Sequence, residues 1–349
     1  LTIDLKSRKT EYKQYWDLKN YMTDKEFHDS DKDELKELLV DAAKLRLVSD
    51  VEVGSYLSGG LDSSYITKLL ADHSKQKLKT FTIGFDADFD EAPHAKEIDN
   101  LIGTKHTTYY LKPEDISEIL FNYSHYFNEP FADNASIPML YLSQNAKKQV
   151  KVVISSDGGD ELFAGYLDYI NFLKYNKLLN KIPKILRLIL QPILKIIYSC
   201  TPQSSNLKNK LWKLKNIINT NSNIQLNNLL FYGSRISYPI LKQVIDKKVL
   251  QQKIDYSFDF DKLNTSSDFK KILYADVNDS LINKMLVKVD KSTMGASIEG
   301  REPLLDHRLF EFMFSFSEEN FIKNRVTKYR FREIIDEDFK KNRLLHKSK

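Results

Sequence analysis

The sequence predicts an α/β fold in which a parallel sheet carries helices on both faces and is followed by a mainly helical region. Strand-like runs of four to seven residues alternate with helix-like segments in the first half, a pattern typical of helix-covered parallel sheets. Two loops with paired glycines each follow a predicted strand directly. Between Gly165 and Gly295 the only glycine is Gly233, which favours a long helical stretch.

The alternation begins near residue 32. Helical spacing of apolar residues predicts helices, and short apolar runs predict strands. The expected helices are 32–48, 62–73, 92–102, 113–127 and 136–149. The expected strands are 51–57, 79–85, 105–110 and 151–155. Ligands of such sheets bind beyond the carboxyl ends of the strands, so we expect both glycine loops at one functional edge.

The predicted organisation is a linker at residues 1–30 and one domain at 31–349. Within that domain we expect an α/β core over residues 31–170 and a helical part over 171–349. Residues 200–225 are polar and suggest a surface connection. The chain starts at Leu1 and ends in Lys-Ser-Lys, so we expect it to be a piece of a longer protein.

Composition indicates a globular protein and argues against nucleic-acid-binding and disulfide-bonded proteins. With 42% apolar residues among 349, the chain can bury a substantial core. Its 53 basic and 48 acidic residues give a mild net charge of +5, which does not indicate nucleic-acid binding. Cys200 is the single cysteine, so no internal disulfide forms and a reducing, cytoplasmic compartment is expected.

The most apolar stretch, residues 182–198, contains three basic residues and two prolines. It predicts an amphipathic helix that packs against the core or a partner rather than a membrane contact. No uncharged run is long enough to span a bilayer, so we expect no membrane association.

The first glycine loop, residues 58–64, reads Ser-Gly-Gly-Leu-Asp-Ser-Ser and indicates a phosphate site. Adjacent glycines let the backbone approach a ligand, and serine hydroxyls with the amides of a helix start suit phosphate oxygens. The loop lacks the Gly-Lys-Ser/Thr ending of Walker A loops and the Gly-x-Gly-x-x-Gly of dinucleotide folds. An ordinary tight turn is the alternative, which Asp62 makes less favoured.

The second loop places Asp157, Asp160 and Glu161 beside two glycines at a strand end. Such crowded carboxylates call for a compensating cation. Mg²⁺ bound with ATP takes one or two carboxylates, and Asp62 and Asp160 could meet across the sheet edge to supply them. A compatible alternative is that Asp157 caps a helix starting at Gly158.

The first loop resembles the pyrophosphate loop of the N-type ATP pyrophosphatases. Together, the two loops and three further segments are similar to the asparagine synthetase family, whose fold is adenine nucleotide alpha hydrolase-like. The matching segments are 81–93, 128–138 and 288–307, followed by Lys328 with Arg332. They occur in family order, and residues 170–270 match only loosely.

The resemblance implies roles for individual residues. Backbone groups of Leu57 and Ile83 would hold adenine, and Asp62 with Asp160 would hold Mg²⁺. Lys328 would neutralise charge on the α-phosphate from the face of an amphipathic helix. The remaining nucleotide-binding positions would be Ser58, Gly59, Gly60, Asp62, Ser63, Ser64, Ser155 and Ser156. Asp157 stands where many members have a glutamate general base, and Glu299, Arg301 and Asp306 would form a charged network under the site.

The implied activity is ATP-dependent amide formation in a synthetase half alone. A carboxylate, by default aspartate, is activated as an acyl-adenylate with release of pyrophosphate, and ammonia then gives asparagine. The expected cofactors are ATP and Mg²⁺, and the expected partners are an acid substrate, ammonia and a missing N-terminal glutaminase domain. A homodimer is possible. The ending at Lys349 suggests that a further helical stretch of the family is cut away.

Alternatives remain open because Asn134 stands where aspartate-using members have an arginine. The same chemistry could act on a sugar uronic acid or close a β-lactam-type ring within one molecule. A tRNA-modifying ATP pyrophosphatase is another reading, weakly supported by a pI near 8.8. A catalytically silent nucleotide-binding module is disfavoured by Asp62, Asp160 and Lys328.

Overall fold

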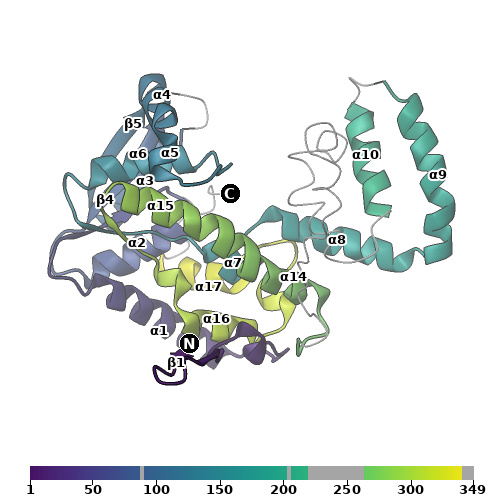
Figure 1. Ribbon diagram of the computed structural model, residues 1–349, viewed down its shortest axis with the longest axis horizontal. Helices are drawn as coiled ribbons and strands as arrows, with labels where there is room; N and C mark the ends of the chain where they lie inside the picture. The colour runs from purple at the N-terminus through teal and green to yellow at the C-terminus, as the bar shows by residue number, and fades with distance from the viewer. Residues whose placement is uncertain (87–89, 203–205, 219–262, 340–349) are drawn as a thin grey trace.

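The computed structural model describes residues 1–86, 90–202, 206–218 and 263–339. Its centre is a five-stranded parallel sheet with the order β5-β4-β3-β6-β7 (Figure 1). The strands are β3 (Val53–Tyr56), β4 (Lys79–Phe85), β5 (Lys105–Leu111), β6 (Val152–Ile154) and β7 (Glu299–Arg301). The four predicted strands all form, and the predicted parallel sheet is confirmed.

The fifth strand, β7, lies in the half of the chain that was expected to be helical. Its sequence, Glu-Gly-Arg, has no apolar side chain and so lacks the usual strand signal. It forms the edge of the sheet, where it pairs in parallel with β6. The C-terminal half of the chain is thereby built into the sheet.

Helices cover both faces of the sheet. Val153 and Ile154 are neighbours on β6, so their side chains point to opposite faces, and each belongs to a different buried cluster. Val153 clusters with residues of α4 and α6, whereas Ile154 clusters with residues of α1, α2 and α3. The bounds are α1 (Asp29–Leu47), α2 (Leu61–His73), α3 (Ala92–Ile102), α4 (Pro113–Phe121) and α6 (Ser136–Ala146).

The helix predicted at 113–127 is two helices. After α4 the chain turns at Asn122 and continues as the short α5 (Tyr123–Tyr126). The Asn122 side chain donates a hydrogen bond of 3.1 Å to the Glu118 carbonyl oxygen. Asparagine competes with the backbone in this way, and the regular helix ends there.

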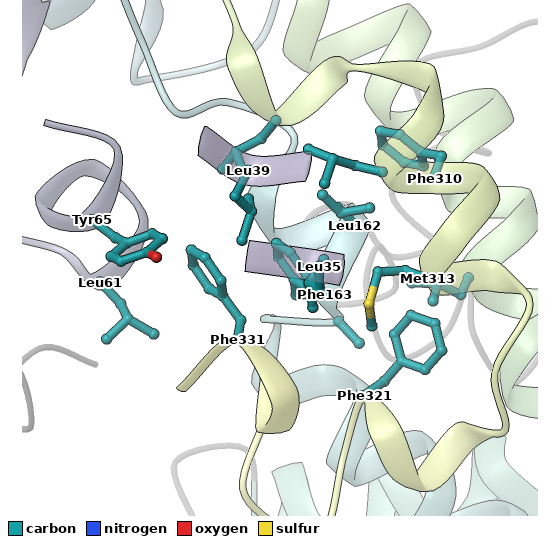
Figure 2. Close-up of a cluster of buried hydrophobic side chains, with 14 of the residues drawn as sticks. Leu35, Leu39, Leu61, Tyr65, Leu162, Phe163, Phe310, Met313, Phe321 and Phe331 are labelled. Carbon is teal, nitrogen blue, oxygen red and sulfur yellow. The ribbon is translucent and has the colours of Figure 1, made fainter. Parts of the chain in front are cut away.

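The larger buried cluster joins elements that are distant in sequence (Figure 2). Phe163 of α7 (Gly159–Phe163) stacks on Phe331 of α17 (Tyr329–Asp338), with ring centroids 4.3 Å apart. Tyr65 of α2 meets Phe331 edge to face at 5.4 Å. Each of these rings is buried and contributes roughly 2 to 3 kcal/mol of hydrophobic stabilisation. Their packing fixes α2, α7 and α17 against one another.

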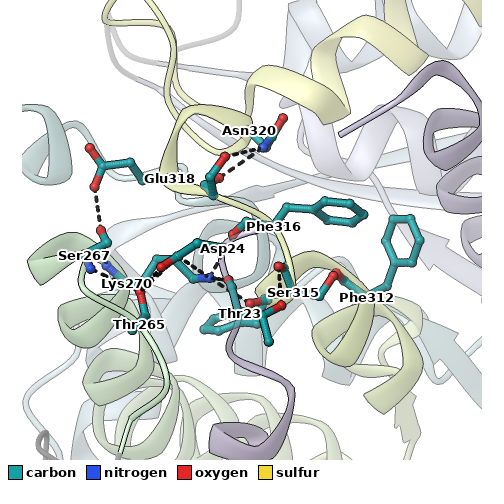
Figure 3. Close-up of polar contacts among 12 residues, drawn as sticks. Thr23, Asp24, Thr265, Ser267, Lys270, Phe312, Ser315, Phe316, Glu318 and Asn320 are labelled. Atoms are coloured by element: carbon teal, nitrogen blue, oxygen red, sulfur yellow. Dashed lines mark hydrogen bonds and ion pairs between the residues drawn. The ribbon is translucent and has the colours of Figure 1, made fainter. Parts of the chain in front are cut away.

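Part of the predicted linker at residues 1–30 belongs to the packed core, which corrects that expectation. The strands β1 (Thr2–Ile3) and β2 (Thr10–Glu11) are exposed, but Leu18 and Met22 are buried. The fully buried Lys270 donates hydrogen bonds to the carbonyl oxygens of Thr23, Phe314 and Phe316 (Figure 3). The short helix η1 (Leu18–Tyr21) precedes this contact. The predicted boundary at residue 31 therefore does not coincide with an edge of the fold.

The second half is mainly helical where it is described. Its helices are α8 (Leu167–Lys181), α9 (Lys184–Cys200), α10 (Asn206–Ile218), α14 (Asp268–Asp276), η3 (Val277–Leu286), α15 (Val287–Gly295), η4 (Pro303–Leu305), α16 (His307–Phe314) and η5 (Glu318–Asn320). α8 leads away from the body to the hairpin of α9 and α10 (Figure 1). The end of the predicted connection, 219–225, and the C-terminal Lys-Ser-Lys lie outside the described residues.

Candidate active site

The first glycine loop connects β3 to α2 at the carboxyl edge of the sheet. Gly59 has φ +78°, and a Cβ there would lie 2.9 Å from the His94 ring and 3.0 Å from the Ala95 nitrogen. Only glycine fits this turn without strain. Inside the loop, the Ser58 and Ser63 hydroxyls lie 2.9 Å apart, and the Gly60 amide donates to Ser58 Oγ at 3.2 Å. Hydrogen bonds of its own serine side chains therefore hold the loop in this conformation.

Two predicted nucleotide contacts of this loop lie in the interior. Ser64 is fully buried, and its hydroxyl has no hydrogen-bond partner among the described residues. The Leu57 side chain is buried as well. The Leu57 amide donates to the Phe81 carbonyl oxygen at 2.9 Å, and its own carbonyl oxygen accepts from the Thr82 hydroxyl. Both backbone groups of Leu57 are thus engaged within the sheet.

The second loop runs from β6 into α7 and brings Asp160 opposite the first loop. Gly158 has φ +90° and forms the turn before α7. At the next position, a Cβ on Gly159 would lie only 2.5 Å from Oδ2 of Asp62. The absence of a side chain at Gly159 lets the two loops approach each other.

Lys328 joins the two loops. Its Nζ lies 2.7 and 2.5 Å from the two carboxylate oxygens of Asp62, and 2.6 Å from Oδ1 of Asp160. The residue precedes α17 with φ +55°, so it is the N-terminal cap of that helix. The sequence instead predicted a position within the helix. Gly165 makes room for the contact, because a Cβ there would lie 1.9 Å from Asp160 Oδ1 and 2.1 Å from Lys328 Cε.

Electrostatics keeps this lysine charged. Burial disfavours the ammonium form, but the carboxylates of Asp62 and Asp160 outweigh burial and raise the pKa of Lys328 above its ordinary value. Burial and the nearby Asp160 charge raise the pKa of Asp62, against the opposing effect of Lys328. The three side chains form one coupled cluster in which the cation holds two carboxylates together.

A cleft of about 340 Å³ lies beside this cluster. Six of the predicted site residues line it, namely Ser58, Ser63, Ile83, Ser155, Ser156 and Asp157. Its remaining walls come from β3, from α6 with the residues before it, and from Lys288 on α15. The exposed Asn134 precedes the lining residue Ala135, so the substituted arginine position lies near the cleft.

Asp157 is held in this cleft by two partners. The Lys288 ammonium lies 3.0 Å from Oδ1, and the Ser155 hydroxyl donates to Oδ2 at 2.7 Å. Burial works against the charged lysine, yet Asp157 outweighs it and raises the pKa of Lys288. The side chain of Asp157 is 20% exposed, so it keeps access to the cleft.

Comparison with known proteins shows the family of the chain. The profile of the asparagine synthase family matches residues 34–347. The chain belongs to the asparagine synthase family. Asparagine synthetase 1 of Bacillus subtilis, a glutamine-hydrolysing enzyme by name, is 30% identical over 87% of this chain and 46% of its own length. The predicted family resemblance is confirmed.

Two further relatives differ in their names and in the share of this chain that they match. A protein of Methanocaldococcus jannaschii, provisionally named as a second asparagine synthetase, is 34% identical over 84% of this chain and 55% of its own length. An amidase of Penicillium rubens, chyE, is 32% identical over 47% of this chain and 27% of its own length. The chain spans about half the length of the asparagine synthetases that it matches over most of its length.

The donor set in this family member fits Mg²⁺ bound together with phosphates. Asp62 and Asp160 converge on a single cationic group, Lys328. Among the described residues, no cluster of three or more His, Cys, Asp or Glu side chains could form an all-protein metal cage. Mg²⁺ is commonly held by one or two carboxylates plus substrate phosphates, and that is the set these residues offer.

Sequence reasoning missed two charged residues near Asp157. Lys288 lies 131 positions from Asp157, and no spacing rule reveals such a contact. Glu302 follows β7, and burial with the Asp157 charge raises its pKa to about 7. Glu302 Oε1 is buried, with no hydrogen-bond partner in the described part of the chain. Lys288 stands in the segment that matched the family, which is the one signal that could have suggested it.

The charged network expected under the site is divided into two parts. Arg301 pairs with Glu299 at 2.7 Å and donates to the carbonyl oxygens of Arg46 and Val48. Asp306 instead contacts the guanidinium groups of Arg46 and Arg308 at 2.8 and 2.9 Å. These hydrogen bonds outweigh burial and hold the pKa of Asp306 well below its usual range. Both parts fasten the end of α1 to the region around β7.

Proposed function

We propose that this chain is the synthetase half of an ATP-dependent amide-forming ligase. It activates a carboxylate as an acyl-adenylate and then transfers ammonia to it, with aspartate as the default acid and asparagine as the product. One observation carries the proposal: a buried lysine bridges acidic residues of two loops at the carboxyl edge of a parallel sheet, beside a cleft. Such an edge is the usual binding position for nucleotides in open α/β sheets.

In the first step, an oxygen of the substrate carboxylate attacks the α-phosphorus of ATP. The bond from that phosphorus to the bridging oxygen of the β-phosphate breaks, and pyrophosphate leaves. Lys328 would contact the phosphate oxygens on which negative charge develops, and its raised pKa keeps it charged near neutral pH. The hydroxyls of Ser58 and Ser63 line the same cleft and are suited to phosphate oxygens.

Asp62 and Asp160 would hold Mg²⁺, which supplies positive charge to the phosphates when it is bound. Their carboxylates already face one cation in the structure, so the two side chains need not be brought together. Lys328 and the metal would then share the neutralisation of two carboxylates and the nucleotide.

In the second step, the nitrogen of ammonia attacks the acyl carbon, the bond from that carbon to the bridging oxygen breaks, and AMP leaves with this oxygen still bound to its phosphorus. A base takes a proton from the nitrogen. Asp157 is the candidate because it lies in the cleft and is partly exposed. Lys288 and Ser155 orient its carboxylate, and each oxygen keeps a free lone pair for the incoming proton.

The ammonia source and the acid are the less constrained parts of this proposal. Relatives named as glutamine-hydrolysing are about twice as long as this chain. Their length supports a glutaminase domain in the same protein as the source of ammonia. We place the reaction in the cytoplasm. Asn134 near the cleft and a relative named as an amidase support an acid other than aspartate, such as a sugar uronic acid or an internal carboxylate that closes a ring.

Exchange of labelled pyrophosphate into ATP tests the first step without requiring the complete reaction. Exchange should depend on one member of a panel that contains aspartate, glutamate, uronic acids and amino acids with a second carboxylate. Adding ammonium should then yield the amide with AMP and pyrophosphate in equal amounts. Release of ADP, or exchange that no acid in the panel stimulates, would contradict the proposal.

A further inference from the structure

Helix α9 presents an apolar face to solvent. Five aliphatic residues recur at the spacing of a single helical face, and each is between 47% and 73% exposed: Ile185, Leu188, Ile189, Ile193 and Ile196. Leu194, on the opposite side of the helix, is only 9% exposed. Among the described residues, the packing of α9 against α10 therefore leaves this apolar face uncovered.

The position of this face sets it apart from scattered surface leucines. Figure 1 shows the α9–α10 hairpin projecting from the body at the end of α8, away from the sheet. Single exposed apolar residues are normal, but a contiguous row over three helical turns marks an interaction site. The sequence left two alternatives for this stretch, packing against the core or against a partner. The five exposed side chains of this face do not pack against the core in the described structure.

The segment that carries this face has charge of one sign. Residues 169–218 contain none of the 48 acidic residues of the chain and ten of its 53 basic residues. The basic residues are Lys174, Lys177, Lys181, Lys184, Arg187, Lys195, Lys208, Lys210, Lys213 and Lys215. The rest of the chain is net acidic, so the hairpin and α8 after its first turn form a separate basic region. Such a region attracts an anionic surface and repels a copy of itself.

The apolar face and the basic composition together favour one kind of partner. A second copy docked through the same face would bring the two basic regions together. A protein interface is depleted in lysine, whereas nine of these ten basic residues are lysines. A helix with an aliphatic face, lysine-rich surroundings and no acidic residues is typical of helices that lie in the headgroup region of a membrane.

We propose that the α9–α10 hairpin is a docking surface for an anionic lipid bilayer. The aliphatic face of α9 enters the boundary between headgroups and acyl chains, and the surrounding lysines contact lipid phosphates. The helix lies on the membrane and does not cross it: no helix in the described ranges is long and apolar enough to span a bilayer. This proposal replaces the expectation of no membrane contact, and it is independent of the proposed ligase activity.

Vesicle flotation tests the proposal. The chain is mixed with vesicles of phosphatidylcholine alone or of phosphatidylcholine with phosphatidylglycerol, at low and high salt. We expect flotation with the anionic vesicles only, and at least a tenfold weaker affinity at high salt, because screening weakens the lysine contacts. The double variant Ile189→Glu with Ile193→Glu should lose at least tenfold in affinity at low salt.

A matched control separates the hairpin from general surface hydrophobicity. Phe121→Glu changes an apolar side chain on α4 that is 90% exposed, and it should leave flotation unchanged. Circular dichroism melting should give the same transition for all variants, because the replaced side chains are exposed. The proposal is overturned by no flotation of the wild-type chain with anionic vesicles, by unchanged flotation of the double variant, or by light scattering that detects a dimer which this variant dissociates.

Discussion

The ammonium of Lys328 lies 2.5 Å from Oδ2 of Asp62, although 266 positions separate the two residues. The same ammonium lies 2.6 Å from Asp160, which places a charged lysine between the two glycine loops. Three packed aromatic rings beneath it, from α2, α7 and α17, hold the backbone segments in place. The site is therefore set by the packing of the core as well as by its own charges.

Replacing Lys328 with methionine should lower pyrophosphate exchange by about 10²- to 10³-fold, the usual cost of losing one group that stabilises charge in a transition state. The two carboxylates also lose their shared cation. The measurement is the initial exchange rate with the acid that the wild type uses. Lys323→Met, which removes an exposed lysine five positions earlier, should retain the wild-type rate. Equal rates for the Lys328 and Lys323 variants would exclude the assigned role.

Replacing Asp157 with asparagine should separate the two steps. The variant cannot accept a proton, so we expect amide formation to fall by about 10²- to 10⁴-fold while pyrophosphate exchange stays within a few-fold of wild type. Both rates are measured on the same preparation with ammonium as the nitrogen donor. Asp290→Asn, on the exposed side of α15, serves as the control. If exchange and amide formation fell in parallel, Asp157 would act in the first step or in folding instead.

Gly165→Ala should lower the activity because the added methyl group has no room beside the ion pair. The added methyl would lie 1.9 Å from Asp160 Oδ1 and 2.1 Å from Lys328 Cε, so the ion pair must separate. We expect at least a tenfold loss of exchange with little loss of secondary structure by circular dichroism. Gly103→Ala has open space around its methyl, so only backbone strain at φ +84° remains, roughly 1 kcal/mol. Full activity of the Gly165 variant would contradict the described geometry.

Stability should fall as the pH rises from about 5 to 7. Burial and the charge of Asp157 raise the pKa of Glu302 to about 7, whereas the same group in an unfolded chain ionises near pH ~4.3. In this window the folded chain binds a proton that the unfolded chain has lost, so the free energy of unfolding decreases with rising pH. Glu161, whose pKa burial also raises to about 7, acts in the same direction.

Urea unfolding of Glu302→Gln checks this pH dependence. Between pH 5 and 7, the free energy of unfolding of the variant should decrease by roughly 1 to 3 kcal/mol less than that of the wild type. Glu161 should account for the decrease that remains. Glu299→Gln changes an exposed carboxylate three positions earlier, at the start of β7, and should keep the wild-type slope. Asp306 does not interfere, because its lowered pKa affects stability only below about pH 4. A Glu302→Gln curve as steep as that of wild type would refute the assignment.

Lys270→Met should destabilise the fold by roughly 2 to 4 kcal/mol. The methionine matches the length of lysine, but it leaves the carbonyl oxygens of Thr23, Phe314 and Phe316 without their shared donor. Urea unfolding measures the loss. Lys148→Met, at an exposed position whose ammonium contacts Asn145, should change stability by less than about 0.5 kcal/mol. A Lys270 variant as stable as the control would show that residues 23–24 are not anchored in this way.

Local sequence signals were sufficient for four of the five strands of the sheet and for the two loops. The apolar runs ending at Tyr56 and Ile154, each followed by paired glycines, predict strands and turns because those rules act over a few residues. Placing Lys328 beside Asp62 required the family resemblance, since no local pattern connects them. The same resemblance gave Lys288 no role, although it holds Asp157 in the structure.

Other features depended on tertiary context that no short pattern contains. β7 is polar and forms because β6 offers an unpaired edge. The helix at 113–127 divides at Asn122, where a side chain competes with a backbone bond. Ser64 belongs to a phosphate-loop pattern in sequence, yet it points into the core because the helix it begins is buried on that side. Residues 17–25 look like a linker, but the buried Lys270 of α14 donates to the Thr23 carbonyl oxygen and to the Asp24 carboxylate.

The distance along the chain between the first loop and Lys328 has a consequence during protein synthesis. The strands β3 to β6 and both loops leave the ribosome long before the residue that neutralises them. Until Lys328 is synthesised, a nascent chain therefore holds the Asp62 and Asp160 carboxylates without the cation that pairs with both of them in the finished structure.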